Sequence, residues 1–260
     1  MLAGVRDILI ISTPEDLPRF QTLLGNGHDF GIHLSYAEQP EPRGSVEAFI
    51  IGEEFIAGDP CALILGDNIF YGNGIGRHLQ RAVARAEESR GATVFAYYVE
   101  DPERYGIVEF DENNKAVSLE EKPADPKSNY AVTGLYFYDG SVCERAHKVQ
   151  KSIRGELEIT NLNQMYLDDE QLAVVVLGRG YTWMDAGTMD SLYEATNFVR
   201  AVERSQDVMV AALEETAYYQ GWIDKDTLRA AAEKWSRSPY GRHLQNVAEG
   251  RIIFSHTHPE

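Results

Sequence analysis

The chain has 260 residues, of which 43% are hydrophobic and 25% are charged, a balance typical of a globular domain rather than of a disordered chain. Lysine and arginine together number 24 and the acidic residues 41, so the formal net charge is −17. This charge excludes a protein that holds nucleic acid through a broad basic surface, because phosphate binding requires clustered cations. It remains compatible with a small phosphorylated substrate bound together with a divalent cation.

The cysteine content and the hydropathy pattern indicate the compartment. Cys61 and Cys143 are too few for the disulfide framework of a small secreted protein. The sequence has no apolar run of the length that spans a membrane, and its first residues do not have the pattern of a signal peptide. We therefore expect a soluble, cytoplasmic protein with no membrane partner.

In the first part of the chain, short apolar runs alternate with longer amphipathic stretches. The apolar runs predict strands at Asp7–Ile11, Leu34–Ala37, Ala62–Leu65 and Thr93–Val99. Between them, helices are expected to begin at Thr13 and to cover 45–55 and 76–88. Such alternation predicts an α/β fold, with a Rossmann-like, mostly parallel sheet flanked by helices.

The pattern changes after Asp101. Tyr105–Phe110 and Ala116–Glu121 flank a polar turn and predict a β-hairpin. Further strands are expected at 131–138 and 173–177 and helices at 144–148 and 158–166, and the chain from about residue 191 is predicted to be helical, with segments at 192–203, 215–222, 225–235 and 240–248. We expect one domain over residues 1–250 and a tail over 251–260.

Two aspartates follow features that favour a functional position. Asp67 comes directly after a predicted buried strand, where open α/β sheets bind their ligands, and a carboxylate there can hold Mg²⁺. Asp185 lies in a predicted loop, and Asp190 is better placed to cap the helix that follows, which leaves Asp185 for another task. The alternative interpretations are an ordinary turn at Asp67 and an ordinary helix cap at Asp185. Sequence alone does not show whether the two side chains meet.

Charged residues at the end of the hairpin and near Arg154 form a second group. In an extended strand, Glu121 shares a face with Leu119, whereas Glu120 points to the opposite side. If Leu119 faces the covered side, Glu121 is the carboxylate held against the body of the protein; the alternative is a solvated strand end. Arg154 lies before a predicted helix, where ordinary capping and surface charge are also possible. The chain has no Gly-rich phosphate loop, no Ser/His/Asp catalytic pattern and no zinc-binding spacing of Cys and His.

Five segments resemble the glucose-1-phosphate thymidylyltransferases of the sugar nucleotidyltransferase family. They are Leu65–Gly72, Asp101–Asp111, Glu120–Pro123, Asn129–Tyr138 and Gly155–Thr160. The likeness extends in order from Met1 to about Leu244. It implies a Rossmann-like fold and transfer of a thymidylyl group from dTTP to α-D-glucose 1-phosphate, with release of diphosphate, in deoxysugar biosynthesis of the dTDP-rhamnose type.

The resemblance also implies roles for individual residues. Asp67 and Asp185 match residues that hold Mg²⁺, with Asp67 also on the nucleotide side. Gln39 and Gly44 match contacts to the thymine base, and Lys122 and Arg154 match groups at the sugar phosphate. The sugar-binding positions of the family match Asn68, Tyr105, Gly106, Glu121 and Val132. The family is commonly a homotetramer, so we expect a homo-oligomer.

Two departures from the family pattern leave alternatives open. The chain begins at a point past the family's Gly-rich signature, so we expect a protein shortened at its N-terminus, with lower stability and slower turnover than a full-length relative. Glu47 stands where the family usually has glutamine. One alternative is therefore a non-catalytic relative that keeps sugar-phosphate or subunit binding. The other is a related sugar-1-phosphate uridylyltransferase.

Overall fold

The computed structural model describes residues 1–252, and these residues divide into two compact units. Unit 1 comprises Met1–Ile10, Asp16–Tyr36 and the residues from Gly187 onward, and unit 2 comprises Ile11–Glu15 and Ala37–Ala186. All the candidate site residues lie in unit 2. One domain over 1–250 stays a prediction. The expected tail over 251–260 falls, from residue 253 onward, outside the described residues.

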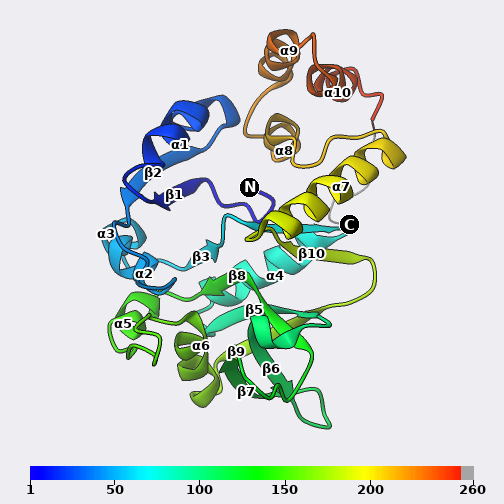
Figure 1. The fold of residues 1–260 in the computed structure, drawn as a ribbon. Helices are drawn as coiled ribbons and strands as arrows, with labels where there is room; N and C mark the ends of the chain where they lie inside the picture. The colour runs from blue at the N-terminus through cyan, green and yellow to red at the C-terminus, as the bar shows by residue number, and fades with distance from the viewer. Residues whose placement is uncertain (253–260) are drawn as a thin grey trace. The chain divides into compact units, whose positions relative to one another are not determined.

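Unit 2 is built on a six-stranded sheet with the order β7-β6-β8-β5-β9, in which β3 also pairs with β8 (Figure 1). The strands are β3 (Cys61–Ile64), β5 (Ala92–Tyr98), β6 (Gly106–Phe110), β7 (Ala116–Glu121), β8 (Tyr130–Tyr138) and β9 (Leu172–Leu177). The long strand β8 runs antiparallel to β3, β5 and β6. Since β9 is parallel to β5, the three strands β3, β5 and β9 share one direction.

The predicted α/β class is confirmed, and the hairpin is confirmed as the antiparallel pair β6–β7. The expectation of a mostly parallel sheet needs correction, because in this sheet the described residues form a single parallel pairing, between β5 and β9. Strand β8 is inserted between β3 and β5 and runs against both. Its apolar pattern predicted a strand correctly, but strand direction depends on tertiary pairing that a local pattern does not contain.

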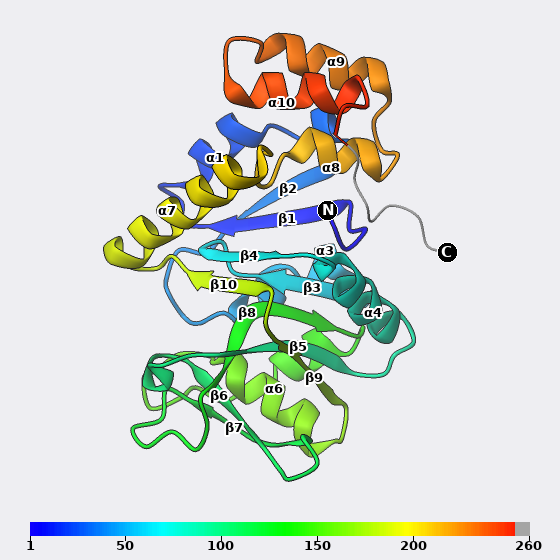
Figure 2. The same cartoon turned by 90° about the vertical axis from the view of Figure 1, so that its right-hand side faces the viewer.

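A separate two-stranded sheet consists of β4 (Asn68–Gly72) and β10 (Tyr181–Asp185), which lie side by side in antiparallel register (Figure 2). The predicted turn at Gly66 and Asp67 is confirmed and comes directly before β4, whereas the loop expected in place of β10 was wrong, because that segment is a strand. The side chains of Asn68 in β4 and Trp183 in β10 are joined by a hydrogen bond although the two residues are 115 positions apart in the chain. Such a long-range pairing leaves no signal in the local sequence.

The helices of unit 2 are α2 (Glu47–Ile51), α3 (Glu53–Ile56), α4 (Ile75–Glu87), α5 (Val142–Ala146) and α6 (Ile159–Asp168), with a 3₁₀ turn η2 at Pro102–Arg104. The single helix predicted over 45–55 is two helices, because the backbone of Gly52 leaves the helical region at ψ 7°. The N–H of Gly52 bonds the carbonyl of Ala48 and closes α2 there.

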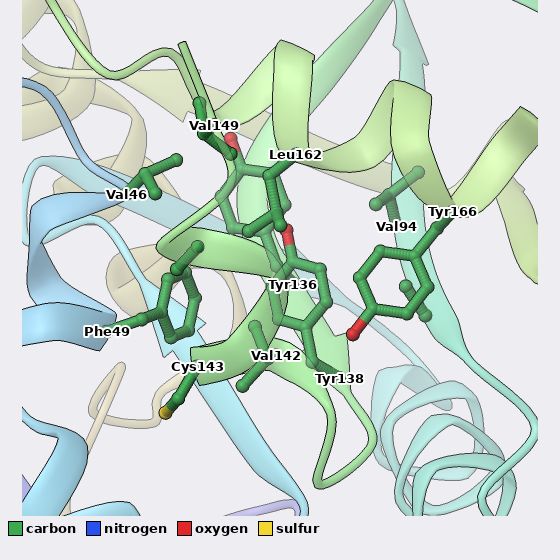
Figure 3. Packing of buried hydrophobic residues seen from close by; sticks show 12 residues of the cluster. Val46, Phe49, Val94, Tyr136, Tyr138, Val142, Cys143, Val149, Leu162 and Tyr166 are labelled. Carbon is green, nitrogen blue, oxygen red and sulfur yellow. The ribbon is translucent and has the colours of Figure 1, made fainter.

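Helix α6 is fixed to the sheet by a core of aromatic and aliphatic side chains (Figure 3). Phe49 packs edge-on against Tyr138 with ring centroids 5.2 Å apart. The buried Tyr138 hydroxyl donates a 2.6 Å hydrogen bond to Asn163 of α6. Leu162 and Tyr166 of α6 are fully buried in the same cluster, and each such side chain contributes roughly 1.5–3 kcal/mol to folding. This packing fixes the first turn of α6, which carries Thr160, against the sheet.

Unit 1 contains the helical C-terminal part that the sequence predicted. Its elements are β1 (Asp7–Ser12), α1 (Leu17–Leu24), the 3₁₀ turn η1 (His28–Phe30), β2 (His33–Glu38), α7 (Met189–Gln206), α8 (Leu213–Tyr219), α9 (Lys225–Lys234) and α10 (Pro239–Ala248). Strands β1 and β2 pair with each other, and their last residues are grouped with unit 2. Leu228 of α9 and Leu244 of α10 are fully buried at the centre of a small core. No helix in the described part of the chain is both long and apolar enough to cross a bilayer.

The start of α7 differs from the prediction. Thr188 is the N-cap: its hydroxyl accepts a bond from the N–H of Ser191, and the Ser191 side chain bonds back to Thr188. Asp190 is therefore not the cap. It lies inside the first turn, where its negative charge interacts favourably with the positive end of the helix dipole. Asp185 is also not a cap, because it ends strand β10.

Candidate active site

Asp67 and Asp185 lie at the same end of the β4–β10 sheet. Asp67 is in the turn before β4, and Asp185 is the last residue of β10, opposite Asn68 in the antiparallel register. The N–H of Ala186 donates a 2.8 Å bond to the carbonyl of Asp67. The antiparallel direction is what brings the end of one strand beside the start of the other. The structure thus brings together the two backbone segments that carry Asp67 and Asp185, and a metal ion shared by their side chains stays a prediction.

The Asn68 side chain connects three strands. Its oxygen accepts bonds from the Trp183 indole N–H, at 2.6 Å, and from the backbone N–H of Gly134, at 3.0 Å. Its Nδ2 donates to Oδ1 of Asp67 at 2.8 Å. Both acceptor positions of the amide oxygen are therefore filled by protein groups. A sugar hydroxyl would have to be bound through the remaining N–H of Nδ2.

Tyr105 lies next to Trp183, with ring centroids 5.2 Å apart in an edge-on arrangement, and Tyr97 lies against the same indole at 6.0 Å. Burial raises the pKa of Tyr105, and the charges of Asp101 and Asp185 raise it further, against the opposing effect of Arg104. Asp185, which pairs with Asn68 in the β4–β10 register, is thus within electrostatic reach of the Tyr105 phenol.

Glu121 is held on the covered side of the hairpin, as its alternation with Glu120 predicted. Its carboxylate accepts a 2.5 Å hydrogen bond from the hydroxyl of Thr160 in the first turn of α6, whereas Glu120 is exposed. Gly106 pairs with Glu121 across the hairpin. A Cβ at Gly106 would lie 2.8 Å from the Thr160 hydroxyl and 3.1 Å from the Glu121 carboxylate. The close approach therefore requires glycine.

Burial raises the pKa of Glu121 above the ordinary value of 4.5, and the neighbouring Glu158 carboxylate raises it further. The hydrogen bond from Thr160 and the charges of Lys122 and Arg154 oppose this shift. Burial, with added effects of Glu121 and Asp67, also raises the pKa of the fully buried Tyr136. Tyr136 thus lies within electrostatic reach of both carboxylates.

The pKa of Glu121 predicts how substitution changes stability with pH. Because the folded-state pKa is raised, ionisation of Glu121 costs stability: the penalty is absent below about pH 4.5 and grows as the pH rises through the folded-state pKa. Glu121→Gln should therefore be more stable than the wild type in urea denaturation at roughly pH 7.5, with little difference near pH 3.5. Glu120→Gln, on the exposed face, is the control and should show no such gain. A Glu121→Gln variant less stable than the wild type at the higher pH would contradict this assignment.

Lys122 and Arg154 are the cations nearest to Glu121. The backbone of Lys122 is left-handed, with φ 44°, and its N–H donates a 2.9 Å bond to the carbonyl of Tyr105. Arg154 forms ion pairs with Glu121 at 3.8 Å and Glu158 at 3.6 Å, and with Glu156 at 3.5 Å. Both residues predicted to contact a phosphate are thus beside the predicted sugar-binding carboxylate.

Gln39 and Gly44 contact each other beside the segment that carries Arg154. Gly44 has φ 100°, and a Cβ there would collide with the backbone of Leu157. The carbonyl of Arg43 accepts a 2.8 Å bond from the N–H of Leu157. The loop that carries Gly44 is therefore fixed against the loop that carries Arg154. The Gln39 side chain donates to Glu47 and to the carbonyl of Gly44.

The structure also identifies residues that the sequence analysis did not single out. Thr160 donates a hydrogen bond to Glu121, and the charge of Glu158 raises the pKa of Glu121. The indole of Trp183 donates a hydrogen bond to Asn68. Tyr136 is within electrostatic reach of the carboxylates of Glu121 and Asp67. Thr160 belongs to a segment that resembles the family, and Trp183 lies two positions before Asp185, so both had a signal in the sequence. Val132 on β8 is half-buried against the hydrophobic clusters on the sheet, and its contact with a sugar stays a prediction.

The donor set is compatible with a divalent cation held jointly with a substrate. Among residues 1–252, no group of three or more His, Cys, Asp or Glu side chains is arranged to bind a metal ion. Mg²⁺, however, commonly takes only one or two carboxylates from the protein and completes its shell with waters and substrate phosphates. Asp67 and Asp185, at one end of the β4–β10 sheet, fit that pattern.

Two aspartates, two cations and polar and aromatic side chains in one α/β unit have the composition of a site that handles phosphorylated substrates. Residues 1–202 match the family described as nucleotidyl transferase. The chain belongs to this family.

Within this family, the chain is similar to proteins named glucose-1-phosphate thymidylyltransferase. The chain is 54% identical, over 94% of its length and 84% of the relative's, to the glucose-1-phosphate thymidylyltransferase of Neisseria meningitidis. It is 50% identical, over 96% of its length and 83% of the relative's, to the enzyme of the same name from Xanthomonas campestris.

Solved structures of nucleotidyltransferases have a similar fold. A protein named as a glucose-1-phosphate thymidylyltransferase from Bacillus anthracis, in complex with sucrose, has a TM-score of 0.66 at 36% identity. The match covers 74% of this chain and 76% of that one. A UDP-glucose pyrophosphorylase bound to UDP-glucose is similar at a TM-score of 0.63 and 22% identity, over 76% of this chain and 82% of that one, and shows the shared fold alone.

Proposed function

We propose that the protein transfers a thymidylyl group from dTTP to α-D-glucose 1-phosphate and releases diphosphate. The observation that carries the proposal is the convergence of Asp67, Asn68, Tyr105, Glu121 and Arg154 in one unit of the structure. Relatives at 50–54% identity with the name glucose-1-phosphate thymidylyltransferase support this choice of substrates. The resemblance further suggests a place in deoxysugar biosynthesis of the dTDP-rhamnose type.

In the proposed reaction, a phosphate oxygen of the sugar phosphate attacks the α-phosphorus of dTTP in line. The new P–O bond forms as the bond from the α-phosphorus to the β-phosphate oxygen breaks, and diphosphate leaves. Such a reaction depends mainly on positioning and on neutralisation of charge. Glu121, Asn68 and Tyr105 would hold and orient the sugar. Lys122 and Arg154 would hold its phosphate against the negative charge of the nucleotide.

We also propose that Asp67 and Asp185 hold Mg²⁺. Their oxygens are the hard ligands that this ion prefers, and the turn before β4 and the last residue of β10 lie at the same end of a sheet. When bound, the ion would offset the negative charge that develops on the nucleotide phosphates. Chelation should abolish turnover, and added Mg²⁺ should restore it.

Diphosphate release tests the proposed function and separates it from the two alternatives. The wild-type chain should release diphosphate only when both dTTP and glucose 1-phosphate are present. A clear preference for UTP over dTTP would favour the uridylyltransferase alternative. Binding of glucose 1-phosphate in calorimetry without any diphosphate release would favour the non-catalytic alternative.

The contact between Thr160 and Glu121 predicts a specific effect on sugar binding. Thr160→Val keeps the shape of the side chain but removes the hydroxyl that holds the Glu121 carboxylate. The KM for glucose 1-phosphate should rise by about 10-fold, the expected loss for one hydrogen bond to a charged group, and kcat should change less. Thr160→Ser, which keeps the hydroxyl, is the control. An unchanged KM in Thr160→Val would show that Thr160 does not position Glu121.

Two further properties are proposed from the resemblance alone. We propose a cytoplasmic location and a homotetramer. Sedimentation equilibrium of the purified chain measures the oligomeric state directly, and a monomer at micromolar concentration would contradict the homotetramer.

A further inference from the structure

The amide nitrogen of Gln39 lies between two groups that can only accept hydrogen bonds. It is 2.8 Å from a carboxylate oxygen of Glu47 and 3.3 Å from the backbone carbonyl oxygen of Gly44. Neither a carboxylate nor a carbonyl can donate, so the Gln39 atom that faces them has to be the NH₂ group. The orientation of this amide is therefore dictated by the chemistry of its neighbours.

Glu47 itself is well fixed. It is the first residue of α2, and its side chain is only 15% exposed. Val46 and Phe49 on either side of it are buried in the core of unit 2. The second carboxylate oxygen of Glu47 lies 3.6 Å from the Arg43 guanidinium. The ion pair with Arg43 and the buried neighbours in the core thus hold the Glu47 side chain in place.

The consequence for Gln39 is that both of its N–H groups are used. One is directed to Glu47 and the other to Gly44. The group left to contact a ligand is the amide oxygen, which only accepts. A glutamine at position 47 would weaken this constraint, because its amide can either donate or accept, and only the longer 3.3 Å contact with the Gly44 carbonyl would then favour one orientation of Gln39.

We propose that Glu47 is a specificity-determining residue, which locks the Gln39 amide so that its oxygen selects pyrimidines with an N–H at ring position 3. This inference rests on the proposed function and on the resemblance, which implies that Gln39 contacts the base. Thymine and uracil carry that N–H. Cytosine has an unprotonated acceptor nitrogen at the same position, so two acceptors would face each other without a hydrogen bond. Glu47 acts through Gln39 and is a positioning residue.

Calorimetric titration of the full chain with dTTP and with dCTP tests the proposal. The wild type should bind dTTP more tightly than dCTP, and dUTP should behave like dTTP in this respect. In Glu47→Gln, the Gln39 amide can turn over, and the dTTP-to-dCTP affinity ratio should fall by about 10-fold, the equivalent of one hydrogen bond. Glu41→Gln is the matched control, since Glu41 also pairs with Arg43 and loses the same charge, but is exposed. Its ratio should equal that of the wild type.

Each other outcome contradicts the proposal in a recognisable way. A ratio in Glu47→Gln equal to that of the wild type, or an equal loss of affinity for both nucleotides, would reduce Glu47 to a structural role and leave the proposed function intact. A wild type that binds dCTP as tightly as dTTP would overturn the inference without any variant, even if Glu47→Gln failed to fold. A wild type that binds no pyrimidine nucleotide would overturn both the inference and the proposed function.

Discussion

Replacement of Asp185 by asparagine is expected to lower kcat by about 10³-fold, the upper range for loss of one group that stabilises charge in a transition state. Asp185 ends β10 opposite Asn68, and the next residue bonds to the carbonyl of Asp67. Asparagine keeps the size of the side chain but removes the negative charge that a divalent cation requires. Because the strand pairing uses backbone groups, the fold should be retained.

Steady-state diphosphate release over a range of Mg²⁺ concentrations measures this effect. Part of the loss should be recovered at high Mg²⁺ if the defect is weaker metal binding. Asp190→Asn is the matched control, since Asp190 lies close in sequence, in the first turn of α7, and is exposed. Activity in Asp185→Asn equal to that of Asp190→Asn would remove Asp185 from the proposed site.

Substitution of Gly134 by alanine is expected to lower kcat/KM by about 10²-fold, although this residue lies on strand β8 and carries no chemistry. A Cβ at Gly134 would lie 2.6 Å from the oxygen and 2.7 Å from the side-chain carbon of Asn68. Asn68 cannot move aside freely, because it bonds to Trp183, to Gly134 and to Asp67. The added methyl group should therefore displace the amide and, with it, the Asp67 carboxylate.

The same change should cost about 1–3 kcal/mol of folding stability through overpacking and weakened buried hydrogen bonds. Gly178→Ala is the control, since a Cβ there meets nothing within 4 Å and the backbone is not left-handed. Parallel urea denaturation and kinetics of the two variants separate the loss of activity from the loss of stability. Full activity in Gly134→Ala would mean that the position of Asn68 does not matter for turnover.

Features set by local periodicity were predictable from the sequence. The alternation along β7 placed Glu121 on the covered face and Glu120 on the exposed one, and the polar turn predicted the hairpin. The helical part of the chain after residue 191 followed from its periodicity in the same way. These features depend on neighbours in the sequence, so the sequence contains the information needed.

Features set by long-range pairing were not predictable. Strand β10 looked like a loop because its partner β4 lies far away in the chain, and the direction of β8 depends on which strands it joins. An acidic residue near a helix start suits the helix dipole, which is why the sequence favours Asp190 as the cap, whereas in the structure the Thr188 hydroxyl accepts the capping bond. The bonds from Trp183 to Asn68 and from Thr160 to Glu121 likewise arise only when distant segments pack together.

The most direct test of the proposed nucleotidyl transfer follows the α-phosphate of dTTP. The chain is incubated with dTTP labelled at the α-phosphorus, glucose 1-phosphate and Mg²⁺, and the products are separated. We predict that the label appears in dTDP-glucose in amounts equal to the diphosphate released, and that Asp185→Asn forms far less of it. Label that stays in dTTP, or that appears in dTMP instead of a sugar nucleotide, would contradict the proposed transfer.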